Sequence, residues 1–474
     1  MKSVGLIRRC LFGWLTLLFA VSLIPAARAA GDDELKSRVD ALVQPLIDDG
    51  KVVGLAIGVI RGAETHVFSY GRLVQGGQNK PTGDTIFEIG AIGQAFTGLL
   101  LADMAERGLV RLDQRVEDLL PAAVSVPKFG DRAITLLDLV THTSGLPRMP
   151  DNFKPKSKMN PHADYTVEQM YDFLSRHTLT RAPGEKYEYS NLGMGLLGHV
   201  LGLRAGLDYE ELLKRRISEP LGLKQTTITL SEEQQKRFAQ GYNARVKPTS
   251  QWDIPTFTGA GGHRSSVNDL LRFLRANIDP AGAPLENALR ASHVQRFEKA
   301  YMPRLAMAWV FADIDSEDTL WLTGASGGFR SVAAFDPKLK IGVVVLANTA
   351  SDETDKLGKQ ILALLSPAIS GIGVGLGWRA EDAGYPTVKE LFRGGPAAKS
   401  GGIAVGDRLV GIEDDKGKLI DFKEKDPRKV IAMIRGARGS SVRIVVEKNG
   451  ERKVYKLIRE IVGQVAQAPS SSKP

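Results

Sequence analysis

The sequence predicts an α+β chain in which strands from both ends of one long region enclose a helical stretch, and a small β-rich domain follows. Residues 52–60, VVGLAIGVI, indicate a buried strand, and residues 66–73 are its expected hairpin partner. Helical patterns then dominate residues 92–275. Strands are expected again at 305–311, 331–336 and 341–348. Terminal strands around a helical insertion are typical of an α+β or α/β domain with one antiparallel sheet, and we adopt α+β.

Two further helices and a change of composition set the domain boundaries. Residues 34–49 have an amphipathic helical pattern, and residues 353–366 predict a closing helix before Pro367. Residues 369–461 start with a glycine-rich run and hold 19 basic against 13 acidic residues. We therefore expect one domain at 32–367, a second at 369–461 and a disordered Ser/Pro/Gln-rich tail at 462–474.

The N-terminus is typical of a signal peptide, expected over residues 1–29. Lys2, Arg8 and Arg9 precede an apolar run at residues 11–25, and Ala27-Arg28-Ala29 supplies small residues for cleavage. The alternative is an uncleaved anchor helix, but the run is shorter than the roughly 20 residues that span a bilayer. We expect a periplasmic or secreted protein without a stable membrane span after cleavage.

Composition excludes several classes of protein. Of 474 residues, 43% are hydrophobic and 25% charged, which is ordinary for a globular protein and excludes a disordered or fibrous chain. Loss of the signal peptide would lower the net charge from +9 to +5 and remove Cys10, the single cysteine. We therefore expect no nucleic-acid partner and no thiolate site. The histidine and acidic residues show no metal-ligand spacing, and no cofactor is expected.

One candidate site lies where a long helix begins. Ile92, Phe96, Leu99 and Met104 recur at helical spacing after Glu88-Ile89-Gly90, so the helix is expected to be buried. Its first turn would offer free N–H groups to a polarised or anionic group.

This segment resembles the serine β-lactamase and penicillin-binding-protein superfamily, in its class C β-lactamase and D-alanyl-D-alanine carboxypeptidase/esterase branch. The resemblance covers residues 35–365. That family carries S-x-x-K at this helix, Y-x-N on a later loop and [KH]-T-G on a strand. The middle motif is intact as Tyr189-Ser190-Asn191, while Thr141–Pro147 and Gly259–Gly262 are typical supporting stretches. The resemblance implies that Tyr189 is a candidate general base and that Asn191 holds the substrate amide.

The other two motifs depart from the family. Ala91 stands at the nucleophile position, Gln94 at the lysine position, and Leu322 at the lysine or histidine position of the third motif. A methyl group cannot attack an acyl carbon, and a glutamine amide offers neither a base nor a positive charge. Loss of the nucleophile in another serine hydrolase costs about 10⁶-fold in turnover. The sequence therefore favours a pseudoenzyme.

A binding shell is expected to survive these changes. The resemblance implies that the N–H groups of Ala91 and Ala325 form the oxyanion hole, which does not depend on their side chains. Thr323, Gly324 and Ser326 complete the expected ligand-binding strand. His142 has a structural role in the family. His263 is either a surface residue or a polar group relocated to the site.

The second domain resembles a bacterial PDZ domain through Gly394–Gly401, Gly406–Ile412 and Val442–Val446. Its glycine-rich loop is expected to hold a peptide carboxylate, and the strand after it to pair with the peptide backbone. The alternative is a brace on the first domain. The expected peptide-binding residues are Gly371, Ile372, Gly373, Val374, Gly375 and Leu376.

Three functions follow from these patterns. The first is an exported pseudoenzyme that binds a peptidoglycan-like peptide or another small acyl ligand, with a PDZ domain that takes protein C-termini or extended peptides. The second is an active hydrolase that uses Ser326 or Ser190, assisted by Tyr189 or His263. The third is a scaffold or adaptor in which the PDZ domain is the functional part.

Overall fold

The computed structural model describes residues 33–461 with gaps at 300–301, 313–317, 367–369, 379–383, 393, 415, 437–438 and 449. The expected signal peptide, the boundary near residue 368 and the expected tail at 462–474 lie outside the described residues. Within the described residues, no helix is both long and apolar enough to cross a membrane.

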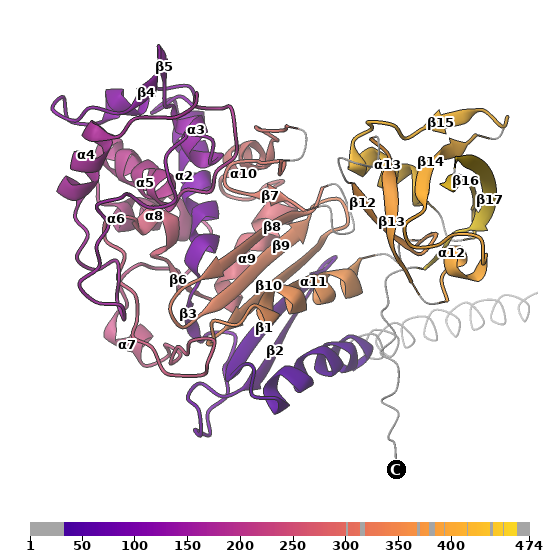
Figure 1. The fold of residues 1–474 in the computed structure, drawn as a ribbon. Helices are drawn as coiled ribbons and strands as arrows, with labels where there is room; N and C mark the ends of the chain where they lie inside the picture. Colours follow the sequence, from indigo (N-terminus) through magenta and orange to yellow (C-terminus); the bar gives the residue numbers. More distant parts are fainter. Residues whose placement is uncertain are drawn as a thin grey trace, which may run out of the picture.

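The first domain is built on a six-stranded antiparallel sheet with the order β2-β1-β10-β9-β8-β7. The expected hairpin is confirmed, and strands from the start of the domain pair with strands from its end (Figure 1). The strands are β1 (Gly54–Arg61), β2 (Glu64–Gly71), β7 (Val310–Phe311), β8 (Leu320–Ala325), β9 (Arg330–Asp336) and β10 (Ile341–Ala347).

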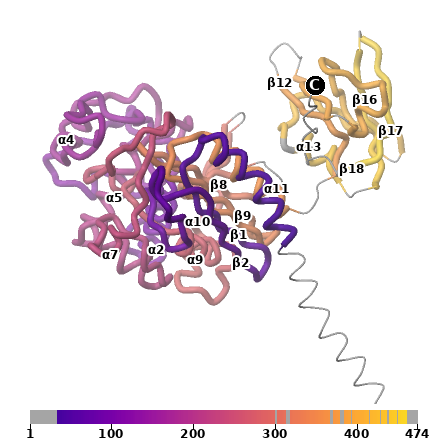
Figure 2. The backbone as a smooth tube through the Cα atoms, turned by 90° about the horizontal axis from the view of Figure 1, so that it is seen from below, coloured from indigo at the N-terminus to yellow at the C-terminus, as the bar shows by residue number. Residues whose placement is uncertain are grey.

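Two hydrophobic clusters cover the two faces of this sheet. Along β10, Val343 and Val345 face one cluster, whereas Val344 and Leu346 face the other. This alternation explains why β10 is apolar throughout, since both faces are buried. The first cluster contains the helix at residues 33–48 and α11 (Glu353–Leu365), which lie side by side in Figure 2. The second contains α2 (Gly93–Glu106) and α9 (Val267–Ile278).

The helical stretch between β2 and β7 is confirmed. It also contains two small ladders, β3 (Ile86–Glu88) with β6 (Arg264–Ser266) and β4 (Lys128–Phe129) with β5 (Arg132–Ala133). The remaining helices are η1 (Gly90–Ile92), η2 (Val116–Leu119), α3 (Leu136–Val140), α4 (Val167–Arg176), α5 (Asn191–Ala205), α6 (Tyr209–Leu213), η3 (Lys214–Ser218), α7 (Glu232–Gln235), α8 (Thr258–Gly261) and α10 (Glu286–His293).

The expected strand at 305–311 is wrong in extent, because only Val310 and Phe311 pair in the sheet. Ala308 has φ 64, a left-handed conformation that interrupts an extended chain. The neighbouring amide of Met307 donates to the Ser292 carbonyl instead of to a strand. The apolar run is buried, but it packs as an irregular segment.

The C-terminal region forms its own sheet around its own hydrophobic cluster, drawn from residues 372–457. The main strand order is β12-β13-β14-β16-β17, so β12 lies at one edge. Its helices within the described residues are the short α12 (Pro396–Lys399) and α13 (Pro427–Ile434). The strands are β11 (Ser370–Gly371), β12 (Val374–Trp378), β13 (Pro386–Leu391), β14 (Arg408–Glu413), β15 (Leu419–Asp421), β16 (Ser441–Lys448), β17 (Glu451–Ile458) and β18 (Glu460–Ile461).

Candidate functional site

Close backbone packing places the start of α2 against the end of β8. Gly90 has φ 50, and a Cβ there would lie 2.6 Å from the Ala325 nitrogen. A side chain at Gly324 would collide with the Ile89 carbonyl, which accepts a hydrogen bond from Ser331 Oγ (2.9 Å). Glycine is therefore required at both positions, and their packing brings Ala91 and Ala325 to one cavity.

This cavity has a volume of about 310 Å³ and joins four of the sequence motifs. The expected residues Ala91, Tyr189, Asn191 and the run Thr323–Ala325 all line it. Gly90 and, from the stretch Gly259–Gly262, Ala260 and Gly261 line it as well. The side chains that the sequence did not single out are Arg148, His162, Trp252, Ile254, Phe257 and Arg330.

Gln94 does not line the cavity but lies fully buried behind it, at the centre of a hydrogen-bond network. Its Nε2 donates to Tyr189 Oη (2.7 Å) and to the Ala260 carbonyl (3.1 Å). Its Oε1 is 3.1 Å from Nε2 of His142. All the polar atoms of the amide therefore have partners, so the side chain is held in one orientation.

His142 fixes the direction of that network. Its Nδ1 accepts the Ser190 N–H (3.1 Å), so the ring proton of the neutral form lies on Nε2 and is donated to Gln94. Burial lowers the pKa of His142 to about 4; the hydrogen bond with Ser190 opposes this shift, and the charge of Arg148 makes a smaller contribution in the same direction as burial. The sequence assigned His142 a structural role, and it fulfils that role directly beside the site.

Tyr189 receives a hydrogen bond from Gln94 and stays protonated. Burial raises the pKa of its hydroxyl, and the bond from Gln94 and the nearby Arg148 oppose this shift only in part. The guanidinium carbon of Arg148 lies 4.8 Å from the centre of the Tyr189 ring. The tyrosine is therefore suited to donate a hydrogen bond into the cavity rather than to act as a base.

Ser190 caps α5 and is enclosed. Its Oγ accepts the Gly193 N–H (2.9 Å) and donates to the Pro147 carbonyl (2.7 Å). Ser326 has its Oγ buried beside the carboxyl group of Glu88. Neither hydroxyl lines the cavity, so the two candidate nucleophiles of the second hypothesis do not face a ligand there.

Leu322 and His263 also lie outside the cavity lining. Leu322 packs into the cluster between the sheet and the helices. His263 is completely buried behind α2, stacked on Phe96, with Nε2 3.0 Å from Tyr209 Oη. Neither expectation for His263 holds, because it is a core residue and neither a surface residue nor part of the cavity.

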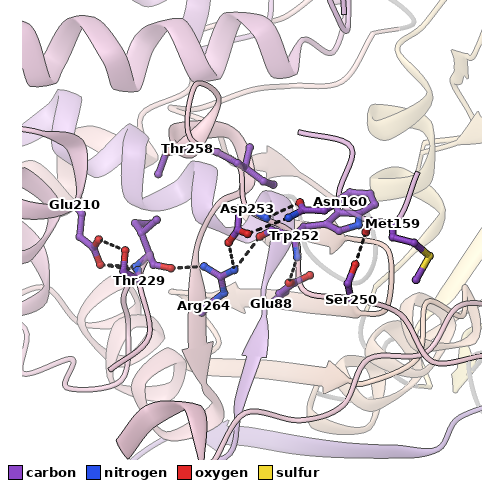
Figure 3. A network of polar contacts seen from close by, with 12 residues as sticks. Glu88, Met159, Asn160, Glu210, Thr229, Ser250, Trp252, Asp253, Thr258 and Arg264 are labelled. Atoms are coloured by element: carbon purple, nitrogen blue, oxygen red, sulfur yellow. Dashed lines mark hydrogen bonds and ion pairs between the residues drawn. The ribbon is translucent and has the colours of Figure 1, made fainter. Parts of the chain in front are cut away.

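A buried arginine organises the wall that the sequence analysis missed (Figure 3). Arg264 donates through Nη2 to the Trp252 carbonyl (2.9 Å) and to Asp253 (3.2 Å), and through Nη1 to the Ile228 carbonyl. The Trp252 N–H donates to Glu88 Oε1 (2.7 Å). Burial raises the pKa of Glu88. This network holds Trp252 at the cavity through both its backbone N–H and its backbone carbonyl.

A second set of contacts joins the loop of Trp252 to the loop of His162. The Asp253 N–H donates to Asn160 Oδ1 and Asn160 Nδ2 donates to Asp253 Oδ2, both at 2.9 Å. Ser250 Oγ donates to the Met159 carbonyl (2.7 Å). The tryptophan in a polar loop, QWDIP, was the available signal, but a lone aromatic residue gives no sequence pattern that predicts its partner.

The expected peptide-binding residues of the C-terminal domain lie on β11, β12 and the turn between them. β12 pairs with β13 on one side only, with a register shift between Gly375 and Leu376. Val374 and Leu376 are partly buried against the local cluster. In the described part of the chain, the outer edge of β12 is therefore unpaired.

The similarities to known proteins fall in the first domain. The β-lactamase family matches residues 39–366. A β-lactamase of Pseudomonas fluorescens is 28% identical over 70% of this chain and 98% of its own length. The D-alanyl-D-alanine-carboxypeptidase/endopeptidase AmpH of Escherichia coli K12 is 26% identical over 72% of this chain and 91% of its own length.

Solved structures show the same relationship. A β-lactamase/D-alanine carboxypeptidase from Yersinia pestis, complexed with citrate, has a TM-score of 0.62 and 27% identity. It covers 69% of this chain and 98% of its own. A class C β-lactamase from Rhodobacter sphaeroides, also 27% identical, has a TM-score of 0.60. The family match covers more than half of the chain and the solved structures share its fold, so the chain belongs to the β-lactamase family.

Proposed function

We propose that this chain is an exported pseudoenzyme of the β-lactamase family that binds a peptide or peptidoglycan-like ligand without acylation. The supporting observation is the pair Ala91 and Gln94. Ala91 lines the cavity with a methyl group, and Gln94 fills the buried position behind it with a fully hydrogen-bonded amide. The site offers neither a nucleophile nor a free base at that turn.

The walls of the cavity support the binding part of this proposal. Thr323 and Asn191 supply polar groups, Trp252 and Phe257 supply apolar area, and the Arg264 network holds the Trp252 loop in place. A concave site with convergent polar groups on an apolar wall is the usual form of a small-ligand site. The relatives named as D-alanine carboxypeptidases make a short peptide the first ligand class to test.

The test is incubation of the mature protein with a fluorescent penicillin, read by intact mass, and with chromogenic cephalosporins and p-nitrophenyl esters. We expect no added mass and no hydrolysis above the buffer rate. A stable penicilloyl adduct would contradict the proposal. Turnover that disappears in Ser326→Ala, but not in the control Ser250→Ala, would establish an active hydrolase with a different nucleophile.

A second activity is proposed for the C-terminal domain, which we infer to be a PDZ-type peptide-binding domain. The supporting observation is the unpaired edge of β12 directly after the glycine-rich turn at Gly373, which has φ 73. A strand edge of this kind can take a peptide as an additional strand, with its carboxylate at the turn.

Fluorescence anisotropy with the full chain tests this second proposal. Peptides with a free apolar C-terminal residue are expected to bind with weak micromolar affinity, and their amidated forms to lose most of the binding. Added salt should weaken binding only modestly, because the main contacts would be backbone hydrogen bonds. Equal binding of free and amidated peptides would indicate recognition of internal strands. If neither the free nor the amidated peptides bind, the C-terminal domain is better explained as a structural support for the first domain.

A further inference from the structure

The polar side chains that line the cavity include cations and hydrogen-bond donors but no carboxylate. Two arginines, Arg148 and Arg330, face the cavity with Tyr189, Asn191 and Thr323, and no aspartate or glutamate is among its lining residues. His162 also lines it, but burial lowers the pKa of His162 to about 4, so this ring is neutral at neutral pH. The cavity therefore has a positive balance, carried by its arginines.

The two arginines differ in what neutralises them. Arg330 donates to Asp355 through Nε (2.8 Å) and Nη2, and Asp352 lies 3.4 Å from its Nη1. Arg148 makes no ion pair with any carboxylate in the described residues, although its charge helps to lower the pKa of the buried His142. The positive charge available to a ligand is therefore that of Arg148.

The Tyr189 hydroxyl is oriented as a donor beside that charge. One of its lone pairs accepts from Gln94, whose own orientation is fixed by His142. Burial raises the pKa of Tyr189, so its proton is retained. Among the described residues no acceptor takes this proton. The hydroxyl is partly buried and lines the cavity, so a ligand oxygen bound there can accept this proton.

We propose that the cavity binds the carboxylate of a short peptide or similar small ligand between the Arg148 guanidinium and the Tyr189 hydroxyl, with Gln94 as the positioning residue. A carboxylate presents two acceptor oxygens to two adjacent donors, and a guanidinium binds it with charge-assisted hydrogen bonds. Arg148 thereby supplies a cation that the third motif lacks at Leu322. This proposal rests on the proposed function, because a ligand must remain bound without being cleaved.

Isothermal titration of the full chain with N-acetyl-D-alanyl-D-alanine, its C-terminal amide and citrate tests the proposal. The acid is expected to bind at least about tenfold more tightly than the amide, which is the scale of one charge-assisted hydrogen bond. Arg148→Gln should remove this preference, and Arg148→Lys should keep part of it because the charge remains while the planar fork is lost. Arg245→Gln, an exposed arginine away from the cavity, is the matched control and should change nothing.

Gln94→Leu tests the positioning role. It leaves Arg148 in place but releases the Tyr189 hydroxyl, so the preference for the acid should fall while the affinity for the amide stays constant. Tyr189→Phe should give the same partial loss. A merely structural role would weaken acid and amide equally.

Equal affinity for acid and amide, or no binding of either acid at millimolar concentration, would overturn this inference. The same samples are examined by intact mass. A covalent adduct would contradict the proposed pseudoenzyme, whereas unmodified protein without acid preference would contradict only the role of Arg148.

Discussion

The two sides of helix α2 carry similar residues in different surroundings. On the cavity side, His142 and Tyr189 are joined through Gln94; on the core side, His263 contacts Tyr209, which lies 2.6 Å from Thr97 Oγ1. Both histidines are buried, and burial lowers the pKa of His142 to about 4 and of His263 to about 3. Only Tyr189 faces a cavity.

The two sides differ in whether each donated proton has an acceptor. On the core side each has one, although Nδ1 of His263 is a buried acceptor without a partner among the described residues. Thr97 Oγ1 donates to the Gly259 carbonyl (2.7 Å), so Tyr209 donates to Thr97 and accepts from Nε2 of His263. Every proton of that chain has an acceptor. On the cavity side the last proton, on Tyr189, has none among the described residues. Both networks contain a histidine and a tyrosine, and they differ in whether a hydrogen-bond donor is left for a ligand. This difference distinguishes a binding site from a polar core.

The largest expected effect is on acid stability. Above pH 6.5 both histidines are neutral in the folded and unfolded states and contribute nothing to pH dependence. Below pH 6.5 the two histidines become protonated in the unfolded chain but stay neutral in the folded protein, where His142 and His263 are buried. The free energy of unfolding therefore falls with pH until the folded-state pKa values near 4 and 3 are reached. His142 contributes roughly 3 kcal/mol of this loss and His263 roughly 5 kcal/mol.

Urea unfolding between pH 4 and pH 7.5 measures this loss of stability in acid. His142→Asn keeps an acceptor for Ser190 and tolerates the left-handed φ of 53, and His263→Gln keeps a donor for Tyr209. Each variant should show a flatter decline with acid than the parent. An unchanged slope in both would mean that these histidines titrate normally in the folded state.

The next effect concerns packing on the core side. A Cβ at Gly93 would overlap the His263 ring, so Gly93→Ala should destabilise the protein by about 1–3 kcal/mol, the usual cost of overpacking. Adding His263→Ala makes room for the methyl group, and the double variant should lose less than the sum of the single losses. Strict additivity in thermal or urea unfolding would show that the two residues do not meet.

An effect of similar size separates the two networks. Thr97→Val and Gln94→Leu each remove hydrogen bonds on one side of α2, and each should cost about 1–3 kcal/mol through buried groups left unpaired. Gln94→Leu should also change ligand discrimination, whereas Thr97→Val should not. If both variants alter the preference for an acid over an amide, the core-side network extends to the cavity.

The smallest expected effect is on catalysis. Ala91→Ser should restore almost no hydrolysis, because Gln94 supplies no base and Tyr189 keeps its proton. Adding Gln94→Lys, and then Leu322→His, should raise the rate of p-nitrophenyl ester hydrolysis stepwise, since such residues act as a unit. Substantial turnover from Ala91→Ser alone would show that Tyr189 suffices as a base.

The sequence by itself determined the architecture of the first domain and showed which residues stand at its motif positions. Apolar runs at β1 and β10 and the helical stretch between β2 and β7 were readable because periodic burial leaves a periodic pattern. The replacements at Ala91, Gln94 and Leu322 were visible without coordinates. The irregular segment at Ala308 was not, because an apolar run does not reveal a left-handed residue within it.

Only the tertiary structure decided which polar residues face a ligand. His263 and Ser326 looked like site residues by their place in the chain, yet the ring of His263 and the hydroxyl of Ser326 are buried outside the cavity. Arg148 and Trp252 carried no motif, and they line it. The burial of a side chain and its hydrogen-bond partners depend on segments that can lie more than a hundred residues away in the sequence. Glu88 and Trp252 are such a pair, and no local sequence pattern predicts their contact.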